Sequence, residues 1–166
     1  MKSLQKFKNK IITLENYLSI QSNHNIENKK VVFTNGCFDI LHQGHVDYLA
    51  QAADYGDLLI IGLNSDDSIR RIKGKHRPIM DQNARAILLA ALVFVDYVII
   101  FEEDTPYQLI QNIKPDILIK GNDYTEESMV GSDIVKAKGG KIITIPLVPG
   151  ISTTHIVQKI KNTPHE

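Results

Sequence analysis

Short, continuous apolar runs alternate with amphipathic stretches along this chain. The runs cover residues 31–34, 58–63, 97–101, 116–120 and 141–145, and they are rich in Val, Ile and Leu. Because polarity does not alternate within them, they predict parallel strands that are covered on both faces. Strand and helix in repeated succession predict an α/β fold, a doubly wound five-stranded parallel sheet with right-handed crossovers and helices on both faces.

Helical patterns fill the intervals between these runs. The segment from Ala84 to Val93 is apolar almost all round, which predicts a deeply buried helix. Thr105 and Pro106 have the pattern of an N-cap followed by proline at the first helical position. Further helices are expected over 45–55, over 131–138 with Gly139-Gly140 closing it, and from about Thr153 to Ile160.

The segment before the first strand has its own pattern. Ile12, Leu14, Tyr17 and Leu18 predict one amphipathic helix, and a polar stretch ending at Lys30 connects it to the sheet. We therefore expect an N-terminal helix and connector over 1–29 and one α/β domain over 30–166.

Composition narrows the class of protein. The 166 residues suit a single domain, and 43% hydrophobic with 23% charged residues is typical of a soluble globular chain. Nineteen basic residues balance nineteen acidic ones, so nucleic acid is not an expected partner. A single cysteine excludes an internal disulfide. Neither a signal peptide nor an apolar stretch of the ~20 residues that a membrane span needs is evident, so we expect a cytoplasmic protein without a membrane partner.

The most informative segment follows the first predicted strand. In doubly wound sheets, ligands bind beyond the carboxyl ends of the strands. Here NGCFDILHQGH (35–45) leads into a helix, and neither G-x-G-x-x-G nor a P-loop occurs, which disfavours dinucleotide dehydrogenases and P-loop NTPases. His42 and His45 are spaced to lie on one side of the first helical turn, where backbone N–H groups attract phosphate. Gly44 leaves room for that phosphate, and Asn35-Gly36 supplies a tight turn with backbone donors.

Other interpretations of this segment remain open. Asp39, His42 and His45 could form a zinc site, although no further ligand set accompanies them. Cys37 invites a nucleophile hypothesis, but no base partner is implied by spacing, and packing is the better account.

GCFDILHQGH, KGNDY (120–124) and GISTTHI (150–156) resemble the H-x-G-H nucleotidylyltransferases of the cytidylyltransferase-like family, whose fold is Rossmann-like. Longer strings are similar to one branch, the adenylyltransferases of ADP-heptose synthesis, over roughly residues 30–160. These strings are VVFTNGCFDILHQGH, FEEDTPYQLI, KPDILIKGNDY and VGSDIVKAKGGK. KNKIITLENYL (8–18) resembles the segment that precedes this domain in the bifunctional kinase–adenylyltransferase. The resemblance implies ATP and a sugar 1-phosphate as substrates, a separate sugar kinase upstream, Mg²⁺ that arrives with the nucleotide rather than on protein ligands, and a homodimer.

A cationic segment at 72–78 contains Lys73, Lys75, His76 and Arg77. It is either a solvated basic loop or a flexible lid that neutralises the β- and γ-phosphates, and the resemblance makes Lys73 the first candidate. Arg85 is similar in position to a family arginine near the phosphates; an ion pair on the helix surface is the alternative.

The remaining candidates follow the later strands. Gly121, Asn122 and Asp123 are either a plain turn or, by the resemblance, a contact to base and ribose. Ser152, Thr153 and Thr154 exceed what one N-cap requires, so the surplus hydroxyls are expected to hold phosphate oxygens. Thr34, Asn35 and Phe38 are expected to shape the nucleotide pocket.

The resemblance implies transfer of AMP from ATP to a heptose 1-phosphate, with His42, His45 and Lys73 as catalytic residues. A cytidylyltransferase acting on glycerol 3-phosphate or another phosphorylated alcohol is the alternative enzyme. Glycerol-phosphate cytidylyltransferases carry an arginine where this chain has Leu147-Val148-Pro149, and this difference argues against the cytidylyltransferase alternative. A regulatory nucleotide-binding module without turnover is the third hypothesis, and the intact histidine pair argues against it.

Overall fold

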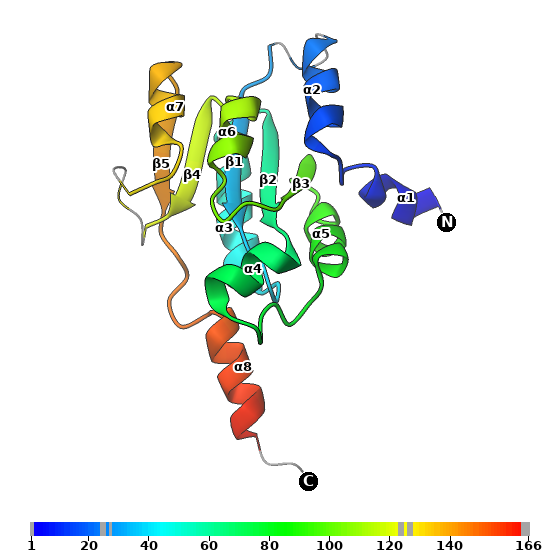
Figure 1. Cartoon of the computed structure of the whole chain (residues 1–166), viewed down its shortest axis with the longest axis vertical. Helices are drawn as coiled ribbons and strands as arrows, with labels where there is room; N and C mark the ends of the chain where they lie inside the picture. The colour runs from blue at the N-terminus through cyan, green and yellow to red at the C-terminus, as the bar shows by residue number, and fades with distance from the viewer. Residues whose placement is uncertain (1, 24–25, 27, 123–124, 126–127, 164–166) are drawn as a thin grey trace.

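The computed structural model describes residues 2–23, 26, 28–122, 125 and 128–163. Its centre is a five-stranded sheet in which every pairing is parallel, in the order β3-β2-β1-β4-β5 (Figure 1). The chain thus adopts the Rossmann-like α/β fold that the apolar runs predict. The strands are β1 (Val31–Gly36), β2 (Leu58–Asn64), β3 (Tyr97–Phe101), β4 (Ile117–Gly121) and β5 (Lys141–Ile145).

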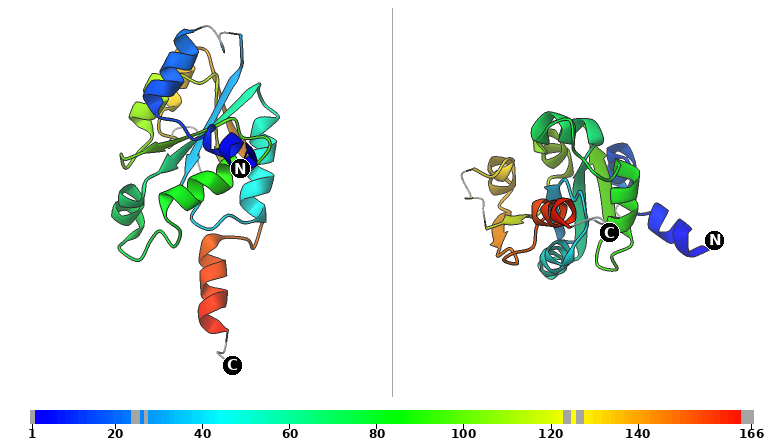
Figure 2. Two further views of the ribbon diagram at one scale, coloured as in Figure 1. Left: turned by 90° about the vertical axis from the view of Figure 1, so that its right-hand side faces the viewer. Right: turned by 90° about the horizontal axis from the view of Figure 1, so that it is seen from below.

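Helices cover both faces of this sheet (Figures 1 and 2). On one face, α1, α3 and α5 contribute Phe7, Leu49 and Leu89 to an apolar cluster. On the other, α2, α6 and α7 contribute Tyr17, Leu109 and Val135 to a second cluster. The helices are α1 (Lys2–Lys8), α2 (Leu14–Ser22), α3 (Gln43–Ala53), α4 (Asp66–Lys73), α5 (Gln82–Ala90), α6 (Tyr107–Ile113), α7 (Ser132–Ala137) and α8 (Thr153–Asn162).

Neighbouring residues of each central strand belong to opposite clusters. In β2, Ile61 packs with the first cluster and Ile60 with the second, and both are fully buried. Because helices cover both faces of the sheet, most positions in such a strand are apolar, which accounts for the hydrophobic runs in the sequence.

The N-terminal segment contains the expected amphipathic helix as α2, with Leu14, Tyr17 and Leu18, and also a helix that was not expected, α1. It forms two helices, and the residues between them pair with the edge of the sheet: the Ile12 amide donates to the Val98 carbonyl and the Val98 amide donates to the Lys10 carbonyl. The open hydrogen-bonding edge of β3 holds this linker in an extended form, which separates the two helices.

Two local predictions were wrong. The apolar stretch 84–93 is not buried throughout: α5 ends at Ala90, and Val93, in the turn that follows, is 91% exposed. Pro106 occupies the N-cap of α6 instead of its first helical position, and no side chain caps that helix. By contrast, α7 closes as expected, because Gly139 has a φ of +80° just beyond the helix end.

Helix α4 was not expected from the sequence. Ser65 caps it by accepting a hydrogen bond from the Ser68 amide, and Asp66 and Asp67 lie in its first turn. Lys73 is its last residue, so only the residues after it form the predicted cationic loop. At the other end of the chain, α8 extends beyond the carboxyl ends of the strands and buries none of its residues (Figures 1 and 2). Within the described ranges, we find no helix with the length and apolar character needed to cross a membrane.

Candidate active site

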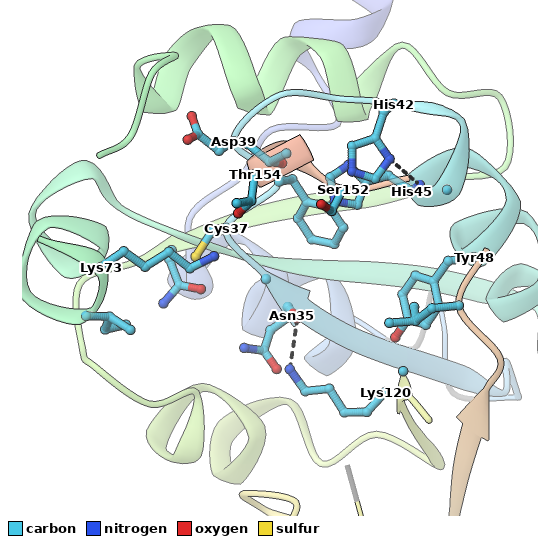
Figure 3. Close-up of a pocket in the computed structure, with 18 of the residues that line it drawn as sticks. Asn35, Cys37, Asp39, His42, His45, Tyr48, Lys73, Lys120, Ser152 and Thr154 are labelled. Carbon is cyan, nitrogen blue, oxygen red and sulfur yellow. Dashed lines mark hydrogen bonds between the residues drawn. The ribbon is translucent and has the colours of Figure 1, made fainter. Parts of the chain in front are cut away.

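A cavity of about 770 Å³ lies beyond the carboxyl ends of the strands, where the strand order reverses between β1 and β4 (Figure 3). The loop after β1, the end of α4, the end of β4 and the starts of α3 and α8 all contribute to its walls. Most of the residues expected from the sequence line it, namely Asn35, Gly36, Phe38, His42, Gly44, His45, Lys73, Gly121, Ser152, Thr153 and Thr154.

The two histidines act as a pair at the start of α3. Their rings are stacked, with centroids 3.7 Å apart and an interplanar angle of 16°. His42 is the N-cap, and its Nδ1 accepts a long hydrogen bond of 3.4 Å from the His45 amide. Because Nδ1 is the acceptor, the neutral ring carries its proton on Nε2, the nitrogen that can donate to a ligand.

Burial keeps both imidazoles neutral. It lowers the pKa of His45 to about 4, with smaller contributions from the nearby charges of His42 and Lys73. Burial also lowers the pKa of His42. Near pH 7 each ring is therefore a neutral hydrogen-bond donor. His45 Nδ1 is buried near the backbone of Ile40, whose hydrogen bonding partly offsets the lowering of the pKa of the ring.

Two glycines and a phenylalanine hold the pair in place. Phe38 has a φ of +44°, which is uncommon for a bulky residue, and its ring meets His45 edge to face at 5.2 Å. A Cβ on Gly36 would come within 3.1 Å of the Phe38 ring, and one on Gly44 within 3.3 Å of the His42 ring. Gly44 thus makes room for the His42 side chain, in addition to its expected role beside a phosphate.

The N-terminus of α8 lies next to that of α3. The position of a Cβ on Gly44 would be 3.8 Å from Ile151, which brings the two helix starts together over the cavity. Ser152 is the N-cap of α8, since its hydroxyl accepts a hydrogen bond from the His155 amide at 3.1 Å. Because the Ser152 hydroxyl is used for capping, the hydroxyls of Thr153 and Thr154 are the ones that remain for the expected phosphate contacts. Two helix N-termini facing one cavity form a strong anion site.

The cationic segment after α4 is held by a buried carboxylate. Asp39 accepts hydrogen bonds from Arg77 Nη1 at 2.6 Å and from the amides of Ile79 and Met80 at 2.7 and 3.1 Å. Its side chain is only 5% exposed. Of the four expected cations, Lys73 and Arg77 line the cavity, whereas Lys75 and His76 are exposed outside the lining. The expected mobile lid is therefore tethered at its Arg77 end.

The hydrogen bonds of Asp39 argue against the hypothesis of a zinc site formed with His42 and His45. Its carboxylate already binds a guanidinium and two amides, and the described ranges contain no metal-compatible cluster of three His, Cys, Asp or Glu side chains. The geometry does not assemble Asp39 with the histidines into such a site. Cys37, a free thiol of intermediate exposure, lies on the cavity wall.

The structure does not bring Arg85 to the cavity lining. Its side chain is fully buried and donates to the carbonyls of Met80, Cys37 and Asn64 and to the Asp66 carboxylate. These four bonds engage the guanidinium beneath the site, so neither a direct phosphate contact nor the surface ion pair fits its position. Arg85 instead ties α5, the loop after β1 and the start of α4 together.

Three further candidates lie away from the lining or outside the described chain. Thr34 is fully buried, and its hydroxyl shares a 2.7 Å hydrogen bond with the Tyr48 hydroxyl, which in turn donates to the Ile119 carbonyl. Asn122 accepts a hydrogen bond from the Leu147 amide and so links the end of β4 to the segment after β5. Asp123 lies outside the described residues.

Several lining residues were missed by the sequence analysis. Tyr48 enters from α3 and Lys120 from the end of β4. Lys120 carried a signal, because it is the one charged residue in the run Ile117–Gly121 and lies at its ligand-facing end. Others are Asn64, Ile72, Asp104, Thr105, Pro106, Val130, Leu147, Val148 and Ile151.

Comparison with known proteins identifies the class. Residues 33–159 match the family model described as cytidylyltransferase-like, and the chain therefore belongs to this family of nucleotidyltransferase domains.

More particular relatives are proteins named bifunctional protein HldE. The chain is 52% identical over 151 residues to HldE of Geobacter metallireducens, covering 91% of this chain and 31% of that protein. It is 53% identical over 160 residues to HldE of Campylobacter concisus, covering 96% of this chain and 33% of that protein. The chain thus spans about a third of the length of these relatives.

Solved structures agree on the fold. The lipopolysaccharide core biosynthesis protein of Thermoplasma volcanium is 34% identical, with a TM-score of 0.62, covering 72% of this chain and 98% of that one. A pantoate-beta-alanine ligase of Francisella tularensis also has a TM-score of 0.62, covering 91% of this chain and 76% of that one. At 19% identity, this second match supports the fold alone.

Proposed function

We propose that this protein transfers AMP from ATP to a heptose 1-phosphate, forming ADP-heptose and pyrophosphate for lipopolysaccharide-type glycan synthesis. One observation carries the proposal: a stacked, neutral histidine pair faces a cavity that two helix N-termini share, at the switch point of a cytidylyltransferase-like domain. Similarity to proteins named HldE and to a lipopolysaccharide core biosynthesis protein supports the heptose branch. By the same resemblance, the proposed source of the sugar 1-phosphate is a sugar kinase.

The reaction is an in-line displacement at the α-phosphorus of ATP. A lone pair of an acceptor phosphate oxygen forms the new bond, and the bond from the α-phosphorus to its oxygen bridge breaks, so pyrophosphate leaves with that electron pair. The protein's work is positioning and stabilisation of charge. His42 and His45 donate to the α- and β-phosphate oxygens, while Lys73, Thr153 and Thr154 bind the β- and γ-phosphates.

Magnesium fits this site as a companion of the nucleotide. Asp39, a carboxylate on the cavity wall, is already engaged by Arg77, so the phosphate oxygens and water are the natural ligands. When bound with the nucleotide, Mg²⁺ would supply positive charge that offsets the negative charge of the phosphates.

Cytidylyl transfer to glycerol 3-phosphate is the competing reaction. The position at which glycerol-phosphate cytidylyltransferases carry an arginine is apolar here, and Leu147 and Val148 line the cavity. This apolar wall can pack against a nucleobase, but it lacks the guanidinium that glycerol-phosphate cytidylyltransferases have at this position. The difference favours the heptose branch.

Pyrophosphate release tests the proposal directly. ATP, CTP and GTP are each assayed with heptose 1-phosphate, other sugar 1-phosphates and glycerol 3-phosphate. We expect ATP with heptose 1-phosphate to give the highest kcat/KM. A tenfold preference for CTP with glycerol 3-phosphate would replace this assignment, and nucleotide binding without turnover on any acceptor would favour a regulatory module.

A further inference from the structure

Lys120 brings a positive charge to the cavity from a wall that the mechanism above does not use. It is the penultimate residue of β4, and its Nζ donates to the Asn35 carbonyl at 2.9 Å (Figure 3). Lys73 lies at the end of α4, which follows β2, and β2 and β4 flank β1 on opposite sides. The two lysines therefore enter the cavity from opposite sides of β1, with the histidine pair on the helix that follows this strand.

The displacement requires two anions to meet. An acceptor phosphate monoester carries up to two negative charges near pH 7, and it must approach a triphosphate that is also anionic. In-line geometry places the entering oxygen and the leaving pyrophosphate on opposite sides of the α-phosphorus. Lys73 lines the cavity from the end of α4, and the proposed mechanism assigns it to the triphosphate. Lys120, on the other side of β1, is then the cation available for the acceptor phosphate.

Asn35 supplies a second observation beside Lys120. Its Oδ1 is buried, and no hydrogen-bond donor among the described residues reaches it. A buried acceptor that finds no donor in the protein is a candidate partner for a donor on a ligand. A sugar phosphate offers both partners close together, a phosphate oxygen for the lysine and a hydroxyl for the Asn35 amide oxygen.

We infer that Lys120 and Asn35 form the acceptor subsite, with Lys120 binding the phosphate of the sugar phosphate and Asn35 Oδ1 accepting from a neighbouring hydroxyl. This inference rests on the proposed nucleotidyl transfer. It assigns the acceptor phosphate to the end of β4 and the triphosphate to the helix N-termini and Lys73. Asn35, which the sequence analysis placed in the nucleotide pocket, thereby becomes an acceptor contact.

Substitution of Lys120 tests the inference. Lys120→Met keeps the length of the side chain and removes its charge, Lys120→Arg retains the charge, and Lys141→Met at the exposed start of β5 is the control. At saturating ATP, we expect Lys120→Met to raise the acceptor KM about tenfold or more, because a hydrogen bond to a charged partner is lost. Lys120→Arg should recover most of the loss, and Lys141→Met should not differ from wild type.

Binding of α,β-methylene-ATP, measured by calorimetry, separates the two substrates. We expect its Kd to stay within twofold in Lys120→Met, with an unchanged unfolding midpoint. An acceptor KM within threefold of wild type, or a nucleotide Kd weakened as much as the acceptor KM, would overturn the inference.

The acceptor that wild type uses distinguishes failure of the Lys120–Asn35 subsite from failure of the proposed function. If wild type uses glycerol 3-phosphate and not heptose 1-phosphate, the proposed function fails, and Lys120 is tested with glycerol 3-phosphate instead. Inactivity with every phosphorylated acceptor would overturn both.

Discussion

His42 and His45 are held as neutral donors by their burial and by their contact with each other. A neutral imidazole that donates through one nitrogen can stabilise charge that develops on an oxygen without moving a proton. The stacking and the Phe38 contact fix both rings before the nucleotide binds, so little reorganisation is needed during the reaction.

Replacement of either histidine tests this role. His42→Ala and His45→Ala should each lower kcat on the order of 10²–10³, or ~2.7–4 kcal/mol, with a smaller change in ATP affinity. His45→Asn should recover part of the loss through its amide donor. Because His42 also caps α3, His42→Asn separates the two roles: asparagine caps well, so the fold should keep its stability while kcat stays low. Steady-state turnover within threefold of wild type for both alanine variants would contradict the catalytic role.

The lowered pKa of His45 predicts a pH-dependent stability. In the unfolded chain this group titrates near 6.5, and in the folded protein near 4. Between these values the unfolded state binds more protons, so His45 destabilises the fold progressively as the pH falls from 6.5 towards 4. In urea unfolding at pH 7.5 and 5.0, His45→Asn should lose less stability than wild type. Equal losses would show that His45 does not carry the effect.

At the scale of elements, the start of α8 contributes hydroxyls to the site although the helix itself extends away from the domain. Thr153→Val keeps the branched shape and removes the hydrogen-bonding group. We expect nucleotide Kd to weaken by about 1.5–3 kcal/mol with the fold intact. Thr163→Val at the far end of the same helix is the control, and calorimetry is the measurement. An unchanged Kd for Thr153→Val would limit this helix start to a capping role.

Arg85 connects elements that are distant along the chain. Removal of one partner from a buried ion pair typically costs about 3–5 kcal/mol, so Arg85→Met should lower the free energy of unfolding by this amount. The exposed Arg70–Asp67 pair within α4 offers a matched control, and Arg70→Met should cost less than about 1 kcal/mol. Chemical denaturation measures both. Similar costs for the two variants would show that the Arg85 network does not hold these loops.

At the scale of the whole molecule, resemblance predicts a homodimer. Sedimentation equilibrium should then give twice the 18.7 kDa mass of one chain. A mass of one chain at micromolar concentration would contradict this prediction.

The sequence by itself determined the features that depend on neighbours along the chain. Strands covered on both faces are mainly apolar, so five runs rich in Val, Ile and Leu predicted five parallel strands. The three-residue spacing of His42 and His45 predicted that both rings lie on one side of a helical turn, because helical geometry fixes that relation locally. Gly139 closes α7 for a similarly local reason.

Tertiary structure decided which polar side chains face the cavity. Arg85 and Thr34 follow the same local patterns as cavity residues, yet each is engaged below the cavity by a residue from another part of the chain: Arg85 bonds to Cys37, 48 positions away, and Thr34 to Tyr48. Asp39 likewise finds Arg77 across 38 positions. Periodicity tells which face of an element a side chain occupies, but the groups that meet it there depend on how distant segments pack. The charges of Asp39 and Arg85 can be buried because the fold brings each of them hydrogen-bonding partners from distant segments of the chain.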